Sequence, residues 1–181
     1  FDQEKYPGFF AWQVPECDKY SRIGVAGIKP KQAFDKLLKS LGVTEIDEYQ
    51  CGLIPMFDPK LNSQKDNVFL IGDAATQVKA TTGGGIVPGM NAAKYLAESI
   101  NTGKSYDKLW KKNLSLNLHL KIRKVLDKFT NEDYAKLIRL MSTDKVIKVM
   151  SETSRDNLIP LAMKLAIAQP RLATFLPKLF K

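Results

Sequence analysis

The chain has 181 residues, enough for one large domain or two small ones, and its 44% hydrophobic and 26% charged residues are typical of a soluble globular protein. No apolar run reaches eighteen residues, so the sequence predicts no transmembrane helix. The net charge is +9, and all of it follows residue 104: residues 105–181 carry 16 basic and 7 acidic side chains, whereas residues 1–104 carry 12 of each. This excess indicates either an anionic partner or a solvated basic face.

The first residues, FDQEKYPGFF, include no initiator Met and no signal-peptide features, so we expect a fragment of a longer chain. The two cysteines, Cys17 and Cys51, do not define a disulfide framework, which favours a reducing, cytoplasmic setting. We expect Cys51 to be a buried structural cysteine, with a role as proton donor or redox thiol as the alternative.

The N-terminal part predicts a hairpin followed by a helix. Residues 9–14 and 20–28 are β-rich and separated by the turn-like ECDK, which is typical of a hairpin. Residues 31–41 have helical apolar spacing after Pro30, and Gly42 closes that helix. Residues 45–54 are expected to form another strand.

The middle of the chain predicts an α/β arrangement. Residues 57–66 are polar and indicate a surface loop, and residues 68–71 form a short apolar run of the kind buried on both faces of an α/β sheet. Residues 86–100 are predicted to be helical. After residue 106 the pattern is all-helical, with helices over 107–129, 132–141 and 144–150 and a proline-punctuated helical tail.

One stretch, residues 67–93, combines features that an ordinary fold does not need. An apolar strand delivers Asp73 to its carboxyl end, where open α/β sheets bind ligands, and this carboxylate can accept hydrogen bonds from sugar hydroxyls. Three consecutive glycines remove every Cβ, so a flat ring or a phosphate can lie on the backbone. A helix then begins at Ile86, and its unpaired N–H groups favour negative charge. Together these features suit a reduced flavin.

The same residues resemble a known family. GDAA at 72–75, QVK at 77–79, TGGGI at 82–86 and GM at 89–90 are similar to the second flavin-binding segment of the geranylgeranyl reductase family, FAD enzymes with the para-hydroxybenzoate hydroxylase type of fold. The resemblance implies that Asp73 binds the ribityl chain and that residues 82–86 pass the pyrimidine edge of the ring. The family usually has Pro after the Lys, where this chain has Ala80. The expected FAD-binding residues are Gly72, Asp73, Thr82, Gly83, Gly84, Gly85 and Ile86.

A second segment carries the same resemblance. PGFFAWQVP at 7–15 is similar to the family motif P-x-x-Y-x-W-x-F-P, and on a strand Phe10, Trp12 and Val14 share one face. The resemblance implies an apolar wall that contacts a prenyl substrate, and an ordinary core-facing strand is the alternative. Phe10 lacks the hydroxyl of the family's Tyr, so no proton-transfer role is assigned to it.

The resemblance covers residues 5–100 and sets the expected organisation. No G-x-G-x-x-G follows a strand, so we expect the ADP-binding turn to lie upstream of residue 1. The fold class is then α/β, the C-terminal part of a two-domain flavoprotein with an all-helical C-terminal region. The expected parts are a β-rich substrate-binding region (1–64), the end of the FAD-binding domain (65–103) and a basic helical region (104–181).

The resemblance implies an FAD-dependent reductase that saturates double bonds of prenyl chains on isoprenoid lipids, with NAD(P)H or ferredoxin as the open alternatives for the reductant. A flavin monooxygenase or halogenase of the same fold is the alternative enzyme, since F-x-W-x-V-P also resembles the halogenase W-x-W-x-I-P. A folded fragment without bound cofactor is the non-enzyme alternative. No catalytic residue is assigned.

The remaining candidates are weaker. His119 is interpreted as a surface or packing histidine, no residue cluster has metal-ligand spacing, and no motif indicates nucleic-acid binding. In the last segment Lys164, Arg171 and Lys178 are spaced by seven among apolar residues, and Lys181 follows. This pattern fits either a peripheral helix on an anionic membrane surface or a helix that covers the protein's own pocket. Pro170 and Pro177 limit the tail to short helical pieces.

Overall fold

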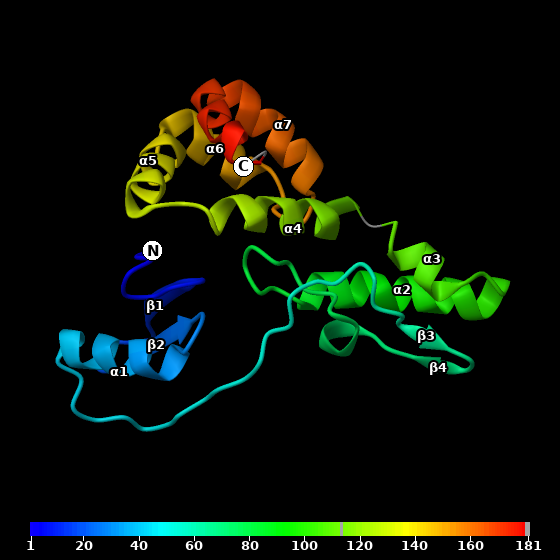
Figure 1. The fold of residues 1–181 in the computed structure, drawn as a ribbon, viewed down its shortest axis with the longest axis horizontal. Coiled ribbons are helices and arrows are strands. Elements are labelled where there is room, and N and C mark those ends of the chain that lie inside the picture. Colours follow the sequence, from blue (N-terminus) through cyan, green and yellow to red (C-terminus); the bar gives the residue numbers. More distant parts are fainter. Residues whose placement is uncertain (113, 180–181) are drawn as a thin grey trace. The chain divides into compact units, whose positions relative to one another are not determined.

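The structure is a computed structural model that describes residues 1–112 and 114–179 (Figure 1). It is mixed α/β, with roughly half of its residues in helices and with small sheets. The chain forms two compact units. Unit 1 comprises residues 1–51 and 129–138, and unit 2 comprises residues 52–128 and 139–181.

Unit 1 is built on the predicted hairpin. Strands β1 (Phe10–Pro15) and β2 (Ser21–Ala26) pair antiparallel, with Phe10 opposite Ala26 and Pro15 opposite Ser21. Helix α1 (Pro30–Leu41) packs on β2 and ends at Gly42, whose φ of 67° is the left-handed conformation that glycine adopts without strain. The predicted hairpin and helix are therefore confirmed.

The start of α5 (Asn131–Met141) closes unit 1 through aromatic contacts. The ring of Tyr134 is buried, stacks on Phe1 at 5.0 Å between centroids and meets Phe129 edge-on at 5.3 Å. Such pairs contribute about 0.5–1.5 kcal/mol beyond simple burial. A segment more than a hundred residues along the chain thereby becomes part of the N-terminal unit.

The strand expected over residues 45–54 is wrong, because this stretch is irregular and no strand pairs with it. Leu53 is 98% exposed, so its apolar side chains do not contribute to a sheet face. Cys51 lies in the same segment and is exposed, which also overturns the expectation of a buried structural cysteine.

In unit 2 the sheet is smaller than expected. Strands β3 (Gln64–Lys65) and β4 (Val68–Phe69) form a short antiparallel hairpin, so the predicted polar loop ends in a strand. The apolar run 68–71 was predicted to be a strand buried on both faces, and this is wrong: only two of its residues pair, and Val68 is 65% exposed. Within the described residues both sheets have two antiparallel strands.

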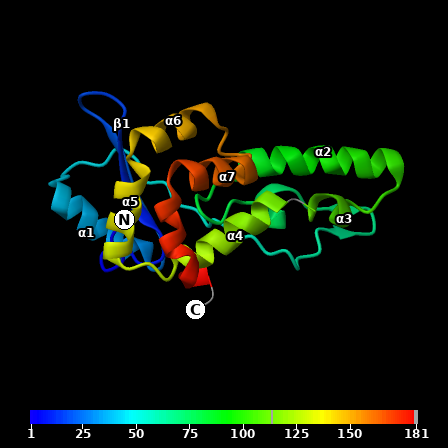
Figure 2. The same ribbon diagram turned by 90° about the horizontal axis from the view of Figure 1, so that it is seen from above.

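The rest of unit 2 is helical, as predicted. A 3₁₀ turn, η1 (Gly72–Ala75), precedes α2 (Ile86–Thr102). The helix predicted over 107–129 is two helices, α3 (Tyr106–Trp110) and α4 (Leu114–Leu126), with residue 113 outside the described part. Helices α6 (Asp144–Glu152) and α7 (Leu158–Ala168) follow, then the 3₁₀ segment η2 (Pro170–Leu179). The tail is thus made of short pieces, and both α7 and η2 contact α4 (Figures 1 and 2).

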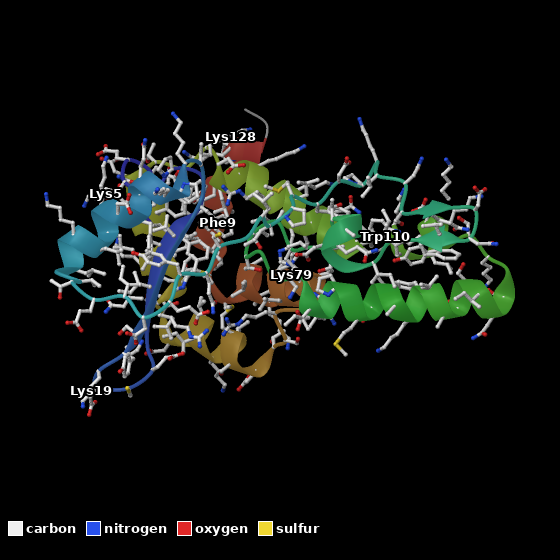
Figure 3. All side chains as sticks on the ribbon, turned by 90° about the horizontal axis from the view of Figure 1, so that it is seen from below. Lys5, Phe9, Lys19, Lys79, Trp110 and Lys128 are labelled. Carbon is white, nitrogen blue, oxygen red and sulfur yellow. The ribbon has the colours of Figure 1, made fainter. Side chains whose placement is uncertain are left out.

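The core of unit 2 lies between α2, α3 and the segment before β3. Buried Phe57, Ala92, Tyr106, Trp110 and Leu116 form one cluster (Trp110 is labelled in Figure 3). Phe57 meets Trp110 edge-on at 6.1 Å, which fixes the irregular segment to α3. Because this segment leads to β4 and η1, the aromatic core also positions the turn that follows them. None of the helices in the described residues combines the length and apolar character needed to cross a membrane.

Candidate functional site

The site begins at η1, where the chain leaves β4. Gly72 has φ 68°, a left-handed conformation that costs a residue with a Cβ about 1–2 kcal/mol. Helix α2 passes close by, since a Cβ added at Gly89 would lie 3.6 Å from the Cα of Gly72. Asp73 follows and is exposed. The backbone thus presents this carboxylate to solvent from a tightly packed support.

The glycine-rich residues form a closed turn before α2. The backbone carbonyl of Lys79 accepts hydrogen bonds from the N–H groups of Thr82 and Gly83 at 3.1 and 2.8 Å. The N–H of Lys79 donates to the carbonyl of Gly84 at 3.1 Å, and Gly83 has φ 72°. The turn is therefore held by its own backbone, and Thr82 and Gly84 are exposed on it.

Gly85 links this turn to Asp73. A Cβ at Gly85 would lie 2.9 Å from Oδ1 of Asp73. The carboxylate of Asp73 therefore occupies space that the side chain of any other residue at position 85 would need. Gly85 is also the N-cap of α2 and provides no side-chain cap, which leaves the first N–H groups of the helix without a side-chain acceptor. Ile86 starts the helix and is 80% exposed.

The structure therefore brings Gly72, Asp73 and Gly85 together at the exposed start of α2. A carboxylate in this place can accept hydrogen bonds from hydroxyl groups. The uncapped helix start can stabilise negative charge, and the missing Cβ atoms leave the backbone open to a flat group. Within this unit the arrangement fits the group that the sequence indicated, a ribityl chain joined to a ring with an anionic edge.

A buried glutamine of the QVK motif, to which the sequence assigned no role of its own, holds the turn. The side-chain carbonyl of Gln77, a fully buried residue, accepts a hydrogen bond from the N–H of Gly72 at 2.8 Å. Its amide nitrogen donates to the hydroxyl of Tyr106 at 2.9 Å, and that hydroxyl donates to the carbonyl of Leu70 at 3.1 Å. Burial raises the pKa of Tyr106, and the hydrogen bond from Gln77 opposes the rise. Helix α3 is thereby connected to the backbone just before Asp73.

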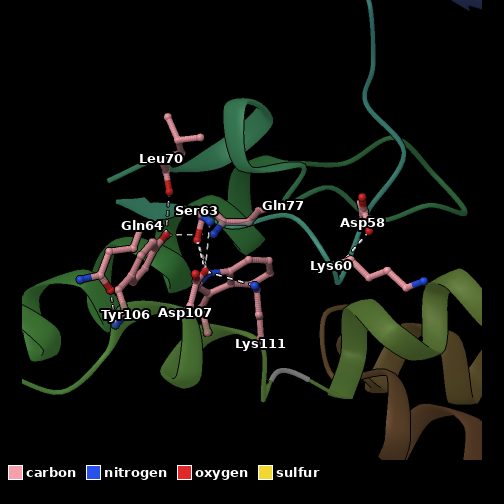
Figure 4. Close-up of polar contacts among 10 residues, drawn as sticks. Asp58, Lys60, Ser63, Gln64, Leu70, Gln77, Tyr106, Asp107 and Lys111 are labelled. Carbon is pink, nitrogen blue, oxygen red and sulfur yellow. Dashed lines mark hydrogen bonds and ion pairs between the residues drawn. The ribbon is translucent and has the colours of Figure 1, made fainter. Parts of the chain in front are cut away.

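A second network anchors α3 to the segment before β3 (Figure 4). The hydroxyl of Ser63 donates to Asp107 at 2.6 Å and accepts a hydrogen bond from the indole of Trp110 at 2.6 Å. Burial alone would raise the pKa of Asp107, but the hydrogen bonds from Ser63 and the charge of Lys111 outweigh it and lower the pKa. Asp107 therefore stays ionised and serves as a structural acceptor.

Helix α4 contacts the glycine-rich turn through His119. This side chain is buried, and its Nδ1 lies 2.7 Å from the hydroxyl of Thr81, whereas its Nε2 has no hydrogen-bond partner. Burial lowers the pKa of His119 to about 4, helped by the charge of Lys79 and opposed by that of Asp156. His119 is thus a neutral packing residue near neutral pH. Lys79 itself forms an ion pair with Asp156, in the segment between α6 and α7.

The residues expected to contact a prenyl chain lie in unit 1. Phe10 and Trp12 meet edge-on at 5.8 Å between ring centroids, and Trp12 and Val14 are 40% and 51% exposed. The indole of Trp12 lies across its cross-strand partner, because a Cβ at Gly24 would come within 2.1 Å of the ring. This face of β1 is therefore an aromatic and partly exposed surface. Unit 1 holds this set and unit 2 holds the glycine-rich set.

The residues that sequence reasoning missed are polar groups in apolar surroundings. Gln77 belongs to the QVK motif that carries the family resemblance, and an uncharged polar residue beside the apolar Val78 was the signal for its structural role. For Asp107 the signal was the short pattern YDKLW, in which an acid lies among aromatic residues. The pairing of Lys79 with Asp156 spans 77 residues and has no local signal.

Proteins similar to this chain are named as reductases, a class of oxidoreductases. The digeranylgeranylglycerophospholipid reductase 2 of Methanothermobacter thermautotrophicus is 29% identical to it over 84% of this chain and 44% of that protein. The corresponding reductase of Methanothrix thermoacetophila is 26% identical over 81% of this chain and 43% of its own length. An uncharacterized protein of Methanocaldococcus jannaschii is 28% identical over 83% of this chain and 43% of its length.

The chain is therefore homologous, over most of its length, to digeranylgeranylglycerophospholipid reductases, which confirms the family resemblance. It spans between 36% and 52% of the length of the curated relatives that it matches. No family model matches the chain. No solved structure matches it either.

Proposed function

We propose that the complete protein is an FAD-dependent reductase that saturates carbon–carbon double bonds of geranylgeranyl chains on isoprenoid glycerophospholipids. The observation that carries this proposal is the position of Asp73, exposed beside Gly85 at the uncapped start of α2. The relatives named for such a reductase activity support the substrate class.

The residues around α2 would each contribute to holding the cofactor. Asp73 would accept hydrogen bonds from ribityl hydroxyls, and the N–H groups at the start of α2 would stabilise negative charge on the pyrimidine edge. Gly84 and Gly85 would let the ring approach the backbone, and Thr82 and Ile86 would lie at its border. Bound and reduced FAD supplies the hydride, with NAD(P)H or ferredoxin as the candidate reductants.

The exposed face of β1 would contact the hydrocarbon. A geranylgeranyl chain offers only apolar surface, and Phe10, Trp12 and Val14 present an aromatic and aliphatic face of matching character. Burying such surface contributes about 25 cal/mol for each Å² removed from water, so a long chain gains affinity without a directional contact. Excluding water from the chain also favours transfer to carbon over side reactions.

Flavin titration of the complete protein tests the cofactor site. Asp73→Ala removes a hydrogen bond to a charged acceptor, which is worth about 1.5–3 kcal/mol, so we expect the Kd for FAD to rise by one to two orders of magnitude. The matched control is Asp18→Ala, which removes an exposed carboxylate from the hairpin loop of unit 1. Equal FAD affinity in the two variants would remove Asp73 from the site.

Product analysis tests the reaction. With a digeranylgeranylglycerophospholipid and a chemical reductant, we expect the mass of the lipid to rise by about two units for each double bond reduced, since each reduction adds two hydrogen atoms. A hydroxylated or halogenated product would instead favour the monooxygenase or halogenase alternative. A protein that contains no flavin and leaves the lipid unchanged would contradict the proposal.

A further inference from the structure

Unit 2 contains a cavity of about 350 Å³ on the side of the glycine-rich turn that faces α4 and α7. This volume falls in the range of small-molecule sites. The polar residues that line it are Lys79, Asn91, Tyr95, Lys112, Ser115, Asp156 and Asn157. The cavity therefore has lysine and amide side chains among apolar residues, with enough room for a small polar group.

Lysine side chains give the cavity its charge. Lys79 is only 15% exposed and forms an ion pair with Asp156, so this pair is close to neutral. Lys112 also lines the cavity and is exposed, and within the described residues it makes no ion pair. The lining thus retains one uncompensated positive charge, next to a lysine that is already partly removed from water.

Three helices begin at this cavity, and their starts lie close together in Figures 1 and 2. They are α2, α4 and α7, with 17, 13 and 11 residues. Their first-turn residues Val87, Leu114 and Leu158 line the cavity. The N-cap residue of α7, Asn157, makes no side-chain cap hydrogen bond, so the amide and the first N–H groups remain available. Each helix start adds about half a positive charge.

We propose that this cavity binds the phosphate group of a phosphate ester. Lys112 and the converging helix starts favour an anion, while the amides of Asn91 and Asn157 and the hydroxyl of Tyr95 can donate hydrogen bonds to its remaining oxygens. The ester is either the headgroup of a glycerophospholipid, which rests on the proposed function and deepens it, or a soluble phosphate ester. Both ligands present the same chemical group to the cavity, a phosphate that carries one or two negative charges.

The test measures binding of three probes to the complete protein by calorimetry: inorganic phosphate, glycerol 1-phosphate and a short-chain phosphatidic acid. Lys112→Glu and Asn91→Asp each bring negative charge to the cavity, so we expect each to weaken binding by about tenfold or more, as the loss of one charge-assisted hydrogen bond predicts. The matched controls are Lys108→Glu on α3 and Asn101→Asp at the end of α2, which make the same charge changes at exposed positions outside the lining.

The probes also distinguish the sources of the phosphate. Tighter binding of phosphatidic acid than of glycerol 1-phosphate would show a lipid headgroup site, and equal binding would show a site for soluble esters. No saturable binding of any probe, or equal affinities in Lys112→Glu and Lys108→Glu, would overturn the proposal. FAD content is measured on the same samples, so a protein that binds phosphate without FAD would contradict the proposed function and leave the phosphate site standing.

Discussion

At the scale of single residues, the candidate site depends on an absent Cβ. Gly85 has φ −106°, which any residue adopts, so its identity is not required by backbone conformation. The contact with Asp73 is the constraint, since a Cβ would come within 2.9 Å of Oδ1. A glycine placed for this reason indicates that the position of the carboxylate matters.

Gly85→Ala should therefore change cofactor binding more than stability. The side-chain end of Asp73 can rotate away at little cost, so we expect the free energy of unfolding to change by less than about 1 kcal/mol. The displaced carboxylate would weaken FAD binding by roughly tenfold, which fluorescence titration of the complete protein measures.

Gly52→Ala is the matched control for this variant. Gly52 is exposed and lies outside the proposed cofactor site, a Cβ there would meet no atom within 4 Å, and its φ is not positive. We expect its FAD affinity to equal that of the unchanged protein. Loss of affinity in both variants, or in neither, would show that the contact between Gly85 and Asp73 has no special role.

Gln77 and Tyr106 should behave as one energetic unit. Gln77→Leu leaves the N–H of Gly72 without its acceptor, at about 1–3 kcal/mol for an unsatisfied buried group, and the hydroxyl of Tyr106 keeps only its hydrogen bond to Leu70. Tyr106→Phe breaks one of the same hydrogen bonds, so the two losses should not add in the double variant. Urea denaturation of the four proteins measures the coupling. Losses of unfolding free energy that add in the double variant would contradict the idea that Tyr106 and Gln77 connect α3 to Gly72 as one hydrogen-bond network.

At the scale of elements, the sequence predicted correctly those helices and strands whose own residues stabilise them. The hairpin of β1 and β2, the proline-started α1 and the long α2 each carry their own turn, cap or periodicity signal, and each is confirmed. The expected strands over 45–54 and 68–71 are wrong beyond Val68–Phe69, because an apolar run becomes a buried strand only when other strands flank it. A sequence pattern does not supply those neighbours.

The candidate site shows the same division. The turn residues from 72 to 86 could be selected from sequence because glycine and aspartate at fixed spacing have local geometric meaning. The partners that hold them in place come from elsewhere: Tyr106 lies 29 residues beyond Gln77, and His119 lies 38 residues beyond Thr81. These long-range contacts had no local signal, and the assignment of the site residues to FAD stays a prediction. So does the division into parts at residues 64 and 103.

The contact of α4 with the glycine-rich turn predicts a pH dependence. Burial lowers the pKa of His119 to about 4 from its usual 6.5, with Lys79 adding to the effect and Asp156 opposing it. Between these values the unfolded chain binds the proton and the folded chain does not, so the contribution of His119 to stability is complete above pH 6.5 and is lost as the pH falls toward 4. We expect unfolding free energies at pH 7 and pH 5 to differ less in His119→Gln than in the unchanged protein. An identical difference in both proteins would show that His119 titrates normally.

At the scale of the whole molecule, the uneven charge has a structural counterpart. The excess of nine positive charges belongs to residues 105–181, which are helical in all their regular elements. On the tail formed by α7 and η2, the basic residues Lys164 and Arg171 are exposed, and so is Leu176, at 52%. Phe175, an apolar residue of the same tail, is buried. Phe180 and Lys181 lie outside the described residues.

If the complete protein reduces a membrane lipid, as we propose, it must reach the membrane surface, and this tail is the candidate for that contact. Basic residues near an anionic bilayer contribute about 1 kcal/mol each, and salt screens them. We therefore expect the complete protein to co-sediment more with anionic vesicles than with neutral ones, with a difference that shrinks as salt rises. Reversing both charges in Lys164→Glu/Arg171→Glu should weaken binding to anionic vesicles by about 2 kcal/mol or more, roughly thirtyfold.

The matched control reverses two exposed lysines of α1, as Lys31→Glu/Lys36→Glu, in the part of the chain with no net charge. It changes the total charge by the same amount, so equal weakening in both double variants would show a general effect of net charge. Leu176→Ser should weaken binding by an amount that salt does not alter, since apolar insertion is not screened. Equal binding to anionic and neutral vesicles would instead indicate that the tail packs on the protein itself through its contacts with α4. The basic residues would then form a solvated surface.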